Sequence, residues 1–164
     1  MDGIKISRIS WIETLVLKNS PNEHFSQLTS FVTVVICSLL LILSAKIKVD
    51  LYPVPMTLQP LAVLLIAMLC GRNIAVAAVS LYLFQGMVGI PVFAYGGGLP
   101  YLLGPTGGFL FGFLFASMII GELADRGWGK QNFKSVFAML TGLMVIYAFG
   151  IFQLSILKGF DFAI

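Results

Sequence analysis

The sequence predicts an all-α membrane protein, a helical bundle with about five transmembrane helices. Hydrophobic residues make up 59% of the chain and charged residues only 10%, whereas charged residues make up about 25% of soluble domains. The chain also contains four uncharged runs, at residues 25–45, 51–71, 73–121 and 135–157. Because a helix of about 20 residues crosses the hydrocarbon core, each run can hold at least one crossing.

The length of 164 residues leaves room for one domain. We expect a single membrane domain over residues 1–164. It comprises an N-terminal cytoplasmic or interfacial segment (1–24), a transmembrane bundle (25–158) and a tail (159–164). Within the first segment, Ile9, Ile12 and Val16 recur at helical spacing beside Trp11, a pattern that predicts a short helix lying in the membrane interface.

Charges, prolines and glycines set the expected helix ends. Lys46 and Lys48 end the first helix, Pro55 opens the second at Met56 or Thr57, and Gly71 ends it. The expected transmembrane helices cover residues 26–45, 56–71, 73–88, 105–124 and 133–157. The second and third have about 15 residues each, or roughly 22 Å, which falls short of a full crossing. The loops beside them should therefore dip inward and line one depression.

One loop stands out, because residues 86–108 hold eight of the seventeen glycines and three of the seven prolines, with no charge. Glycine permits positive φ and close approach, while proline fixes φ and removes a donor. Irregular backbone beside apolar helices requires protein or a water-lined cavity around it. We interpret this loop as the wall or lid of a pocket; an ordinary turn on the outer side is the alternative.

The basic residues predict the orientation. A cytoplasmic N-terminus places seven basic residues inside and three outside, and a positive inner side is the usual arrangement. The inner set is Lys5, Arg8, Lys18, Arg72, Arg126, Lys130 and Lys134, and the outer set is Lys46, Lys48 and Lys158. We therefore expect a multi-pass protein of the cell membrane with both pocket loops on the outer side.

Several function classes are excluded. No Gly-x-x-x-x-Gly-Lys-Ser/Thr loop occurs, so ATP hydrolysis by that route is absent. The single histidine, His24, precedes the expected bundle, which argues against an intramembrane enzyme, and we expect no catalytic residues and no cofactor. Cys37 and Cys70 lack metal-site spacing and should be free, buried thiols, so no metal site is expected. A net charge of +3 suits a lipid bilayer rather than nucleic acid.

Neutral polar and aromatic residues remain as site candidates. Thr57 and Gln59 place a hydroxyl and an amide at the mouth of the depression. Phe93, Tyr95 and Tyr101 flank the triplet Gly96, Gly97 and Gly98, and aromatic faces beside backbone amides suit a flat, mostly uncharged ligand with heteroatoms. The alternative for the aromatic residues is an interfacial belt. Further neutral polar residues could have a structural role instead, either helix capping or interhelical hydrogen bonding. They are Asn73, Ser80, Gln85, Thr106 and Gln153.

Four motifs together closely resemble the BioY family, the biotin-specific substrate-binding S components of energy-coupling factor (ECF) transporters. They are PVPMTLQPLAVLLIAMLCG, LYLFQGMVGIPVFAYGGG, LLGPTGGFLFGF and LMVIYAFG, spread over residues 53–150. The resemblance implies a six-helix membrane protein that captures biotin from outside. It also implies partners, namely a membrane coupling subunit and paired ATPase subunits, and uptake by reorientation of the loaded component.

The resemblance also implies roles for particular residues. Thr57 and Gln59 match the family's helix-two motif, residues 93–98 match the loop over the bicyclic ring, and Tyr147 matches the aromatic residue of the fifth helix. The family pattern continues into a sixth helix opened by a Pro-Gly-Asp-x-x-Lys motif, whose Asp and Lys are expected to contact ligand. Residues 1–164 do not include that motif. A second hypothesis is therefore a truncated, non-transporting remnant or a membrane assembly protein without ligand.

Overall fold

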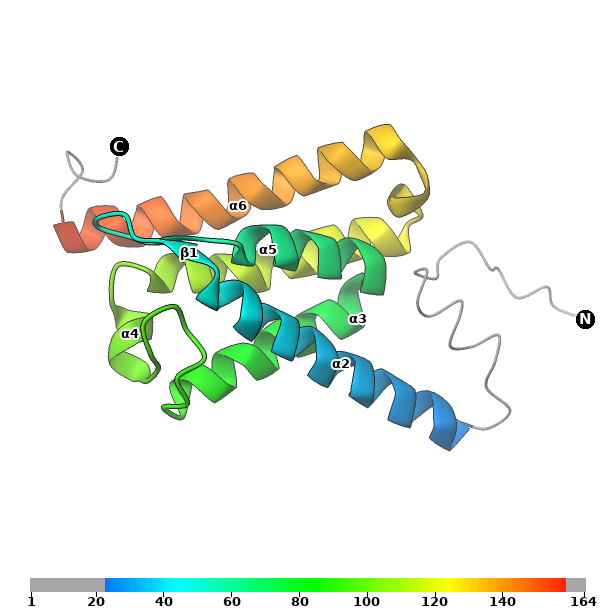
Figure 1. Cartoon of the computed structure of the whole chain (residues 1–164). Helices are drawn as coiled ribbons and strands as arrows, with labels where there is room; N and C mark the ends of the chain where they lie inside the picture. The colour runs from blue at the N-terminus through cyan, green and yellow to red at the C-terminus, as the bar shows by residue number, and fades with distance from the viewer. Residues whose placement is uncertain (1–22, 159–164) are drawn as a thin grey trace, which may run out of the picture.

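The computed structural model describes residues 23–158 of the chain. This part is built from four long helices, two short ones and a two-stranded ladder (Figure 1). The elements are α2 (Glu23–Lys46), β1 (Lys48–Val49), β2 (Met56–Thr57), α3 (Gln59–Met87), α4 (Leu99–Leu103), α5 (Gly107–Asp125), η2 (Trp128–Lys130) and α6 (Asn132–Lys158). The interfacial helix expected before residue 24 and the tail 159–164 lie outside the described residues.

The helix α3 is a hairpin of two short limbs rather than one rod. Gly71 has φ 78° and ψ 179°, far from helical values, and the two limbs meet there. Gln59 and Tyr82 would be about 34 Å apart on a straight helix with a rise of 1.5 Å per residue. Their side chains instead meet at 2.7 Å. The expectation of two short helices separated near Gly71 is therefore correct, because a backbone conformation available essentially to glycine alone reverses the chain.

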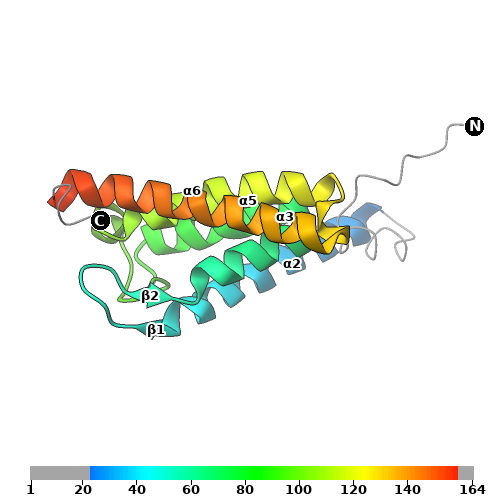
Figure 2. The ribbon, with the colours of Figure 1, turned by 90° about the horizontal axis from the view of Figure 1, so that it is seen from above.

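The helices are arranged in the order α2, α3, α5, α6, with α3 and α5 in the middle. Contacts join α2 to α3, α3 to α5 and α5 to α6, and Figures 1 and 2 show α2 and α6 on opposite sides of the bundle. In the described part, four helices are long and apolar enough to cross a membrane, and α3 is one of them. With the two limbs of α3 counted separately, the described part has five long helical segments, so the predicted fold class of a helical membrane bundle is confirmed.

Small residues let α5 and α6 approach closely. A Cβ on Gly108 would lie 2.4 Å from the carbonyl oxygen of Phe149, and one on Gly112 would lie 2.9 Å from the Cα of Ile146. Ala116, one turn further, is fully buried. Gly108 and Gly112 therefore belong to the packing surface between the two helices, and Ala116 continues the buried stripe at i, i+4 and i+8.

The connection between α2 and α3 differs from the expectation. Residues 56 and 57 form β2, which pairs antiparallel with β1 so that Lys48 lies opposite Thr57. The helix begins at Gln59, with Pro60 in its first turn, a position that costs no hydrogen bond. The predicted start at Met56 or Thr57 is wrong because ladder pairing with β1 holds these residues extended.

Two further boundaries are corrected. The loop 86–108 is not irregular throughout, since it contains α4, with Pro100 in its first turn. His24 lies inside the first turn of α2 and not before it. Cys37 and Cys70 are buried thiols that form no disulfide bond, as predicted, and their sulfur atoms lie 3.8 Å apart between α2 and α3.

Candidate ligand-binding site

The described residues enclose a cavity of about 450 Å³ at one end of the bundle. This end, which carries β1, β2 and α4, is called the loop end below; the reversal at Gly71 and η2 lie at the other end (Figure 1). The cavity volume falls within the roughly 300–1,000 Å³ of small-molecule pockets. Its lining comes from the connection 51–58, the first limb of α3, the loop 86–108, α5 and α6, and no charged residue is among the described lining residues.

A polar corner lies where β2 meets α3. Thr57 and Gln59 both line the cavity, and the Thr57 hydroxyl lies 3.4 Å from Gln59 Oε1. Gln59 Nε2 donates to the Tyr82 hydroxyl oxygen at 2.7 Å. Gln59 is only 4% exposed, so a buried amide, fixed at one end, faces a mostly apolar cavity.

Phe93 forms the aromatic part of the wall. Its ring is fully buried, lies edge-on to Tyr82 at 5.4 Å and stacks on Tyr101 at 4.9 Å. Gly86 makes room for it, since a Cβ there would lie 2.0 Å from Phe93 Cζ. The ring is therefore held by contacts on several sides, which makes this part of the wall rigid.

Lys46, the last residue of α2, ties that helix to the same wall. Its ammonium group donates to the carbonyl oxygens of Pro91 and Phe93 at 2.8 and 2.7 Å. Ammonium-to-carbonyl bonds are stronger than neutral ones. The chain on either side of Phe93 is therefore anchored from outside the loop.

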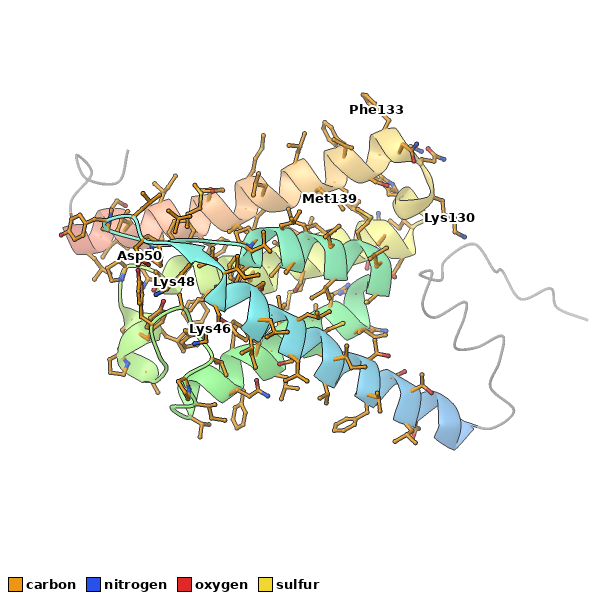
Figure 3. All side chains as sticks on the ribbon, viewed as in Figure 1. Lys46, Lys48, Asp50, Lys130, Phe133 and Met139 are labelled. Carbon is orange, nitrogen blue, oxygen red and sulfur yellow. The ribbon has the colours of Figure 1, made fainter. Side chains whose placement is uncertain are left out.

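Tyr95, Lys48 and Asp50 form a cluster that joins the two connections at the loop end; Figure 3 shows Lys46, Lys48 and Asp50 grouped there. The Tyr95 hydroxyl donates to Asp50, and Lys48 Nζ lies 3.2 Å from the Tyr95 ring centroid. The hydrogen bond from Tyr95, reinforced by Lys48, lowers the pKa of Asp50 below its usual value. The same hydrogen bond raises the pKa of Tyr95.

Tyr147 reaches the cavity from α6. It is one of the lining residues, and its ring lies edge-on to Phe109 of α5 at 5.9 Å. Aromatic side chains from the loop, α5 and α6 thus form part of the cavity wall.

The structure brings four of the eight predicted site residues to the cavity: Thr57, Gln59, Phe93 and Tyr147. Tyr95 is 56% exposed, and neither it nor Gly96, Gly97 and Gly98 is among the lining residues. The glycine triplet instead shapes the loop. Gly98 N–H donates to the Gly86 carbonyl at 2.6 Å, and a Cβ on Gly97 would lie 2.2 Å from the Ile90 carbonyl oxygen.

Sequence reasoning missed several residues of the site. Tyr82 and Lys46 act through contacts between segments far apart in the chain, and no local pattern marks them. The apolar lining residues Phe109, Phe113 and Leu143 resemble any other core positions in the sequence. Gln153, for which helix capping or interhelical hydrogen bonding was the alternative to a role in the site, donates to the carbonyl oxygens of Leu102 and Gly104 and so holds the end of α4.

Comparison with known proteins gives consistent matches. The model of the BioY family matches residues 18–163. A protein of Thermotoga maritima named biotin transporter BioY is 42% identical over 118 residues, covering 71% of this chain and 68% of that protein. A probable biotin transporter BioY of Lysinibacillus sphaericus is 38% identical over 119 residues, covering 73% of this chain and 61% of that protein.

Among solved structures, the chain resembles the S-component for biotin from an ECF-type ABC transporter. The TM-score is 0.75 at 22% sequence identity, and the match covers 86% of this chain and 78% of that one. This similarity supports the fold. The family model covers most of the residues, and the T. maritima relative exceeds 40% identity. The chain therefore belongs to the BioY family.

Proposed function

We propose that this protein is a membrane-embedded biotin-binding and uptake subunit of an ECF-type vitamin transporter. The observation that carries the proposal is the uncharged cavity at the loop end, with Thr57 and Gln59 at one corner and Phe93 and Tyr147 on its walls. Biotin has a compact bicyclic ring whose ureido group bears N–H donors and a carbonyl acceptor. A mostly apolar cavity with a small number of placed polar groups suits such a ring.

The family supports the same conclusion. The relatives above are named biotin transporters, and the structural match is to a component of a transporter. The function is thus transport and not catalysis. The aligned segments span 68% and 61% of the lengths of the two relatives.

The proposed partners are an ECF membrane coupling subunit and paired ATPase subunits. The ATPase subunits supply the energy for uptake. The chain is a multi-pass membrane protein, and the proposed location is the cell membrane with the N-terminus cytoplasmic. In that orientation the loop end faces outward, where biotin is captured.

Isothermal titration of the purified protein with biotin and desthiobiotin tests capture and selectivity together. We expect binding of biotin, and a loss of roughly tenfold or more in affinity on Gln59→Ala, because a buried hydrogen bond is removed. Gln153→Ala removes a half-buried amide that does not line the cavity and should weaken binding less. No biotin binding by the wild-type protein would indicate a membrane protein without this ligand, and equal losses in the two variants would contradict the placement of the site.

A further inference from the structure

A buried hydrogen bond joins the two limbs of α3 beside the cavity. Gln59 in the first limb donates through Nε2 to the hydroxyl oxygen of Tyr82 in the second limb, at 2.7 Å. Gln59 is 4% exposed and Tyr82 is fully buried. Gln59 lines the cavity, whereas Tyr82 is not among its lining residues. Tyr82 therefore stands directly behind a residue of the site.

The position of the Tyr82 hydroxyl is itself fixed. The Tyr82 ring meets the ring of Phe93 edge-on at 5.4 Å, and Phe93 lies against Gly86, one turn further along the same limb. A fully buried ring among such contacts has one position available to it. The hydroxyl group is consequently held in one position, where its oxygen accepts from Gln59 Nε2.

Tyr82 and Thr57 together set the direction of the Gln59 carboxamide, since a tyrosine hydroxyl alone can either donate or accept. The Gln59 backbone N–H donates to Thr57 Oγ1, which leaves the Thr57 hydroxyl proton for Gln59 Oε1, and the Tyr82 oxygen accepts from Nε2. The Gln59 amide has a donating nitrogen and an accepting oxygen with two lone pairs. Since the nitrogen is directed at Tyr82, the oxygen is directed away from it, toward Thr57, whose hydroxyl lies at the long distance of 3.4 Å. Oε1 therefore keeps accepting capacity on the cavity side.

We propose that Tyr82 is a positioning residue that sets the direction of the Gln59 amide, so that the cavity presents a carbonyl oxygen to an N–H donor of the ligand. This carbonyl oxygen selects ligands that carry the N–H group of a cyclic urea, a lactam or an amide. The identity of the ligand rests on the proposed function, under which the donor is a ureido N–H of biotin. Without the Tyr82 hydroxyl, Gln59 Nε2 loses its buried hydrogen-bond acceptor, and the amide turns this nitrogen toward the cavity, where it meets the ligand N–H as a second donor.

The test compares biotin with its two singly N-methylated ureido analogues in wild-type protein and in Tyr82→Phe, which keeps the ring packing. In the wild type, methylation of the nitrogen that faces Gln59 weakens binding. In Tyr82→Phe, biotin affinity falls roughly tenfold, while the affinity of that analogue changes little because its bond to Gln59 is already absent. The ratio of the two dissociation constants therefore shrinks. Any steric effect of the methyl group is common to both proteins and cancels in this comparison.

Two further variants separate positioning from general damage. In a Gln59→Leu background, Tyr82→Phe should have little additional effect on biotin affinity, because the amide it orients is gone. Tyr52→Phe changes an exposed tyrosine outside the cavity lining and should leave the ratio unchanged. Thermal unfolding of each variant in detergent reports its folding.

The outcomes are distinct. Equal weakening of biotin and of both analogues by Tyr82→Phe, or additive losses in the double variant, overturns the positioning role and leaves the proposed function standing. Absence of biotin binding by the wild-type protein overturns the proposed function and this inference with it.

Discussion

At the scale of single residues, the close approach of Phe93 to Gly86 holds the cavity wall. Any side chain larger than hydrogen at position 86 would occupy the space of the Phe93 ring, since a Cβ there lies 2.0 Å from Cζ and 2.5 Å from two further ring atoms. Phe93 cannot move aside freely because Tyr82 and Tyr101 contact its ring. Even a methyl group at position 86 should therefore displace Phe93 and so change the shape of the cavity.

We expect Gly86→Ala to destabilise the protein by about 1–3 kcal/mol, the usual cost of overpacking a core, and to weaken biotin binding by displacing Phe93. Denaturant or thermal unfolding in detergent and titration with biotin measure the two effects. Gly129→Ala is the matched control, because its nearest neighbour is the flexible Met68 side chain at 3.4 Å. A Gly86→Ala protein as stable as Gly129→Ala would contradict this account of the wall.

At the scale of elements, the reversal in α3 depends on one backbone conformation and on groups from α5. The Arg72 backbone N–H, which opens the second limb, donates to Asp125 Oδ2 at 3.1 Å. The Arg72 side chain pairs with Glu122 at 3.1 Å. Gly121 lies against the same turn, with a would-be Cβ 2.4 Å from Arg72 Cα. The end of α5 therefore caps a helix limb that has no capping side chain of its own at Gly71.

Gly71→Ala should cost about 1–3 kcal/mol of stability, because φ 78° with ψ 179° is a region that side-chain-bearing residues rarely occupy. The loss should appear as a lower midpoint of thermal unfolding in detergent. It should also weaken biotin binding, since the reversal brings Tyr82 back to Gln59. Wild-type stability in this variant would mean that the limbs do not depend on the glycine conformation.

A second element-scale prediction concerns the Lys48–Asp50–Tyr95 cluster, which joins the connection 47–58 to the loop 86–108. Because Asp50 has a pKa below its usual value, the cluster is fully formed above the usual pKa of aspartate and is lost as the pH falls through the lowered value. At the alkaline end it is lost as the pH rises through the raised pKa of Tyr95. The cluster therefore joins the two connections throughout the neutral pH range.

The pKa of Asp50 can be measured by carbon-detected NMR of its carboxyl group. We expect a value below that of an ordinary aspartate in the wild type and a rise toward it in Tyr95→Phe, since the Tyr95 hydrogen bond is the largest cause of the shift. Lys48→Met should raise it less. A carboxyl group that titrates identically in the wild type and in Tyr95→Phe would show that the hydrogen bond does not form in solution.

At the scale of the whole molecule, the bundle is a series of contacts in which α2 touches α3 and α6 touches α5. Figure 2 shows these two helices as the outer members of the bundle. Only 28% of the α2 span and 22% of the α6 span is buried within the protein. Most of their apolar side chains therefore face outward, as expected for helices that contact lipid. The cavity is lined from α3, α5 and α6, and α2 supports it through Lys46, which holds the chain at Phe93.

The cysteine pair reports on this assembly. Cys37 and Cys70 are each 5% exposed and lie between α2 and α3, so maleimide labelling of both should be slow in the folded protein and should accelerate together on unfolding. A Met56→Cys variant in a background lacking both native cysteines supplies the fast reference, since Met56 is exposed. Labelling of the native pair at the rate of that reference would show that α2 is not packed on α3.

The sequence by itself determined the membrane class, the approximate limits of five transmembrane segments and the presence of a glycine-rich pocket loop. These follow from apolar runs and from glycine and proline, whose effects are local along the chain. It also placed Thr57 and Gln59 beside a depression, because both lie next to a helix start.

Only the tertiary structure decided which side chains meet there. It directed Gln59 toward Tyr82, anchored the carbonyl of Phe93 on Lys46 and turned Tyr95 away to Asp50. Each of these pairs joins segments between 23 and 47 positions apart. Contacts at such separations depend on how helices pack and where the chain reverses, which no local pattern of residues encodes.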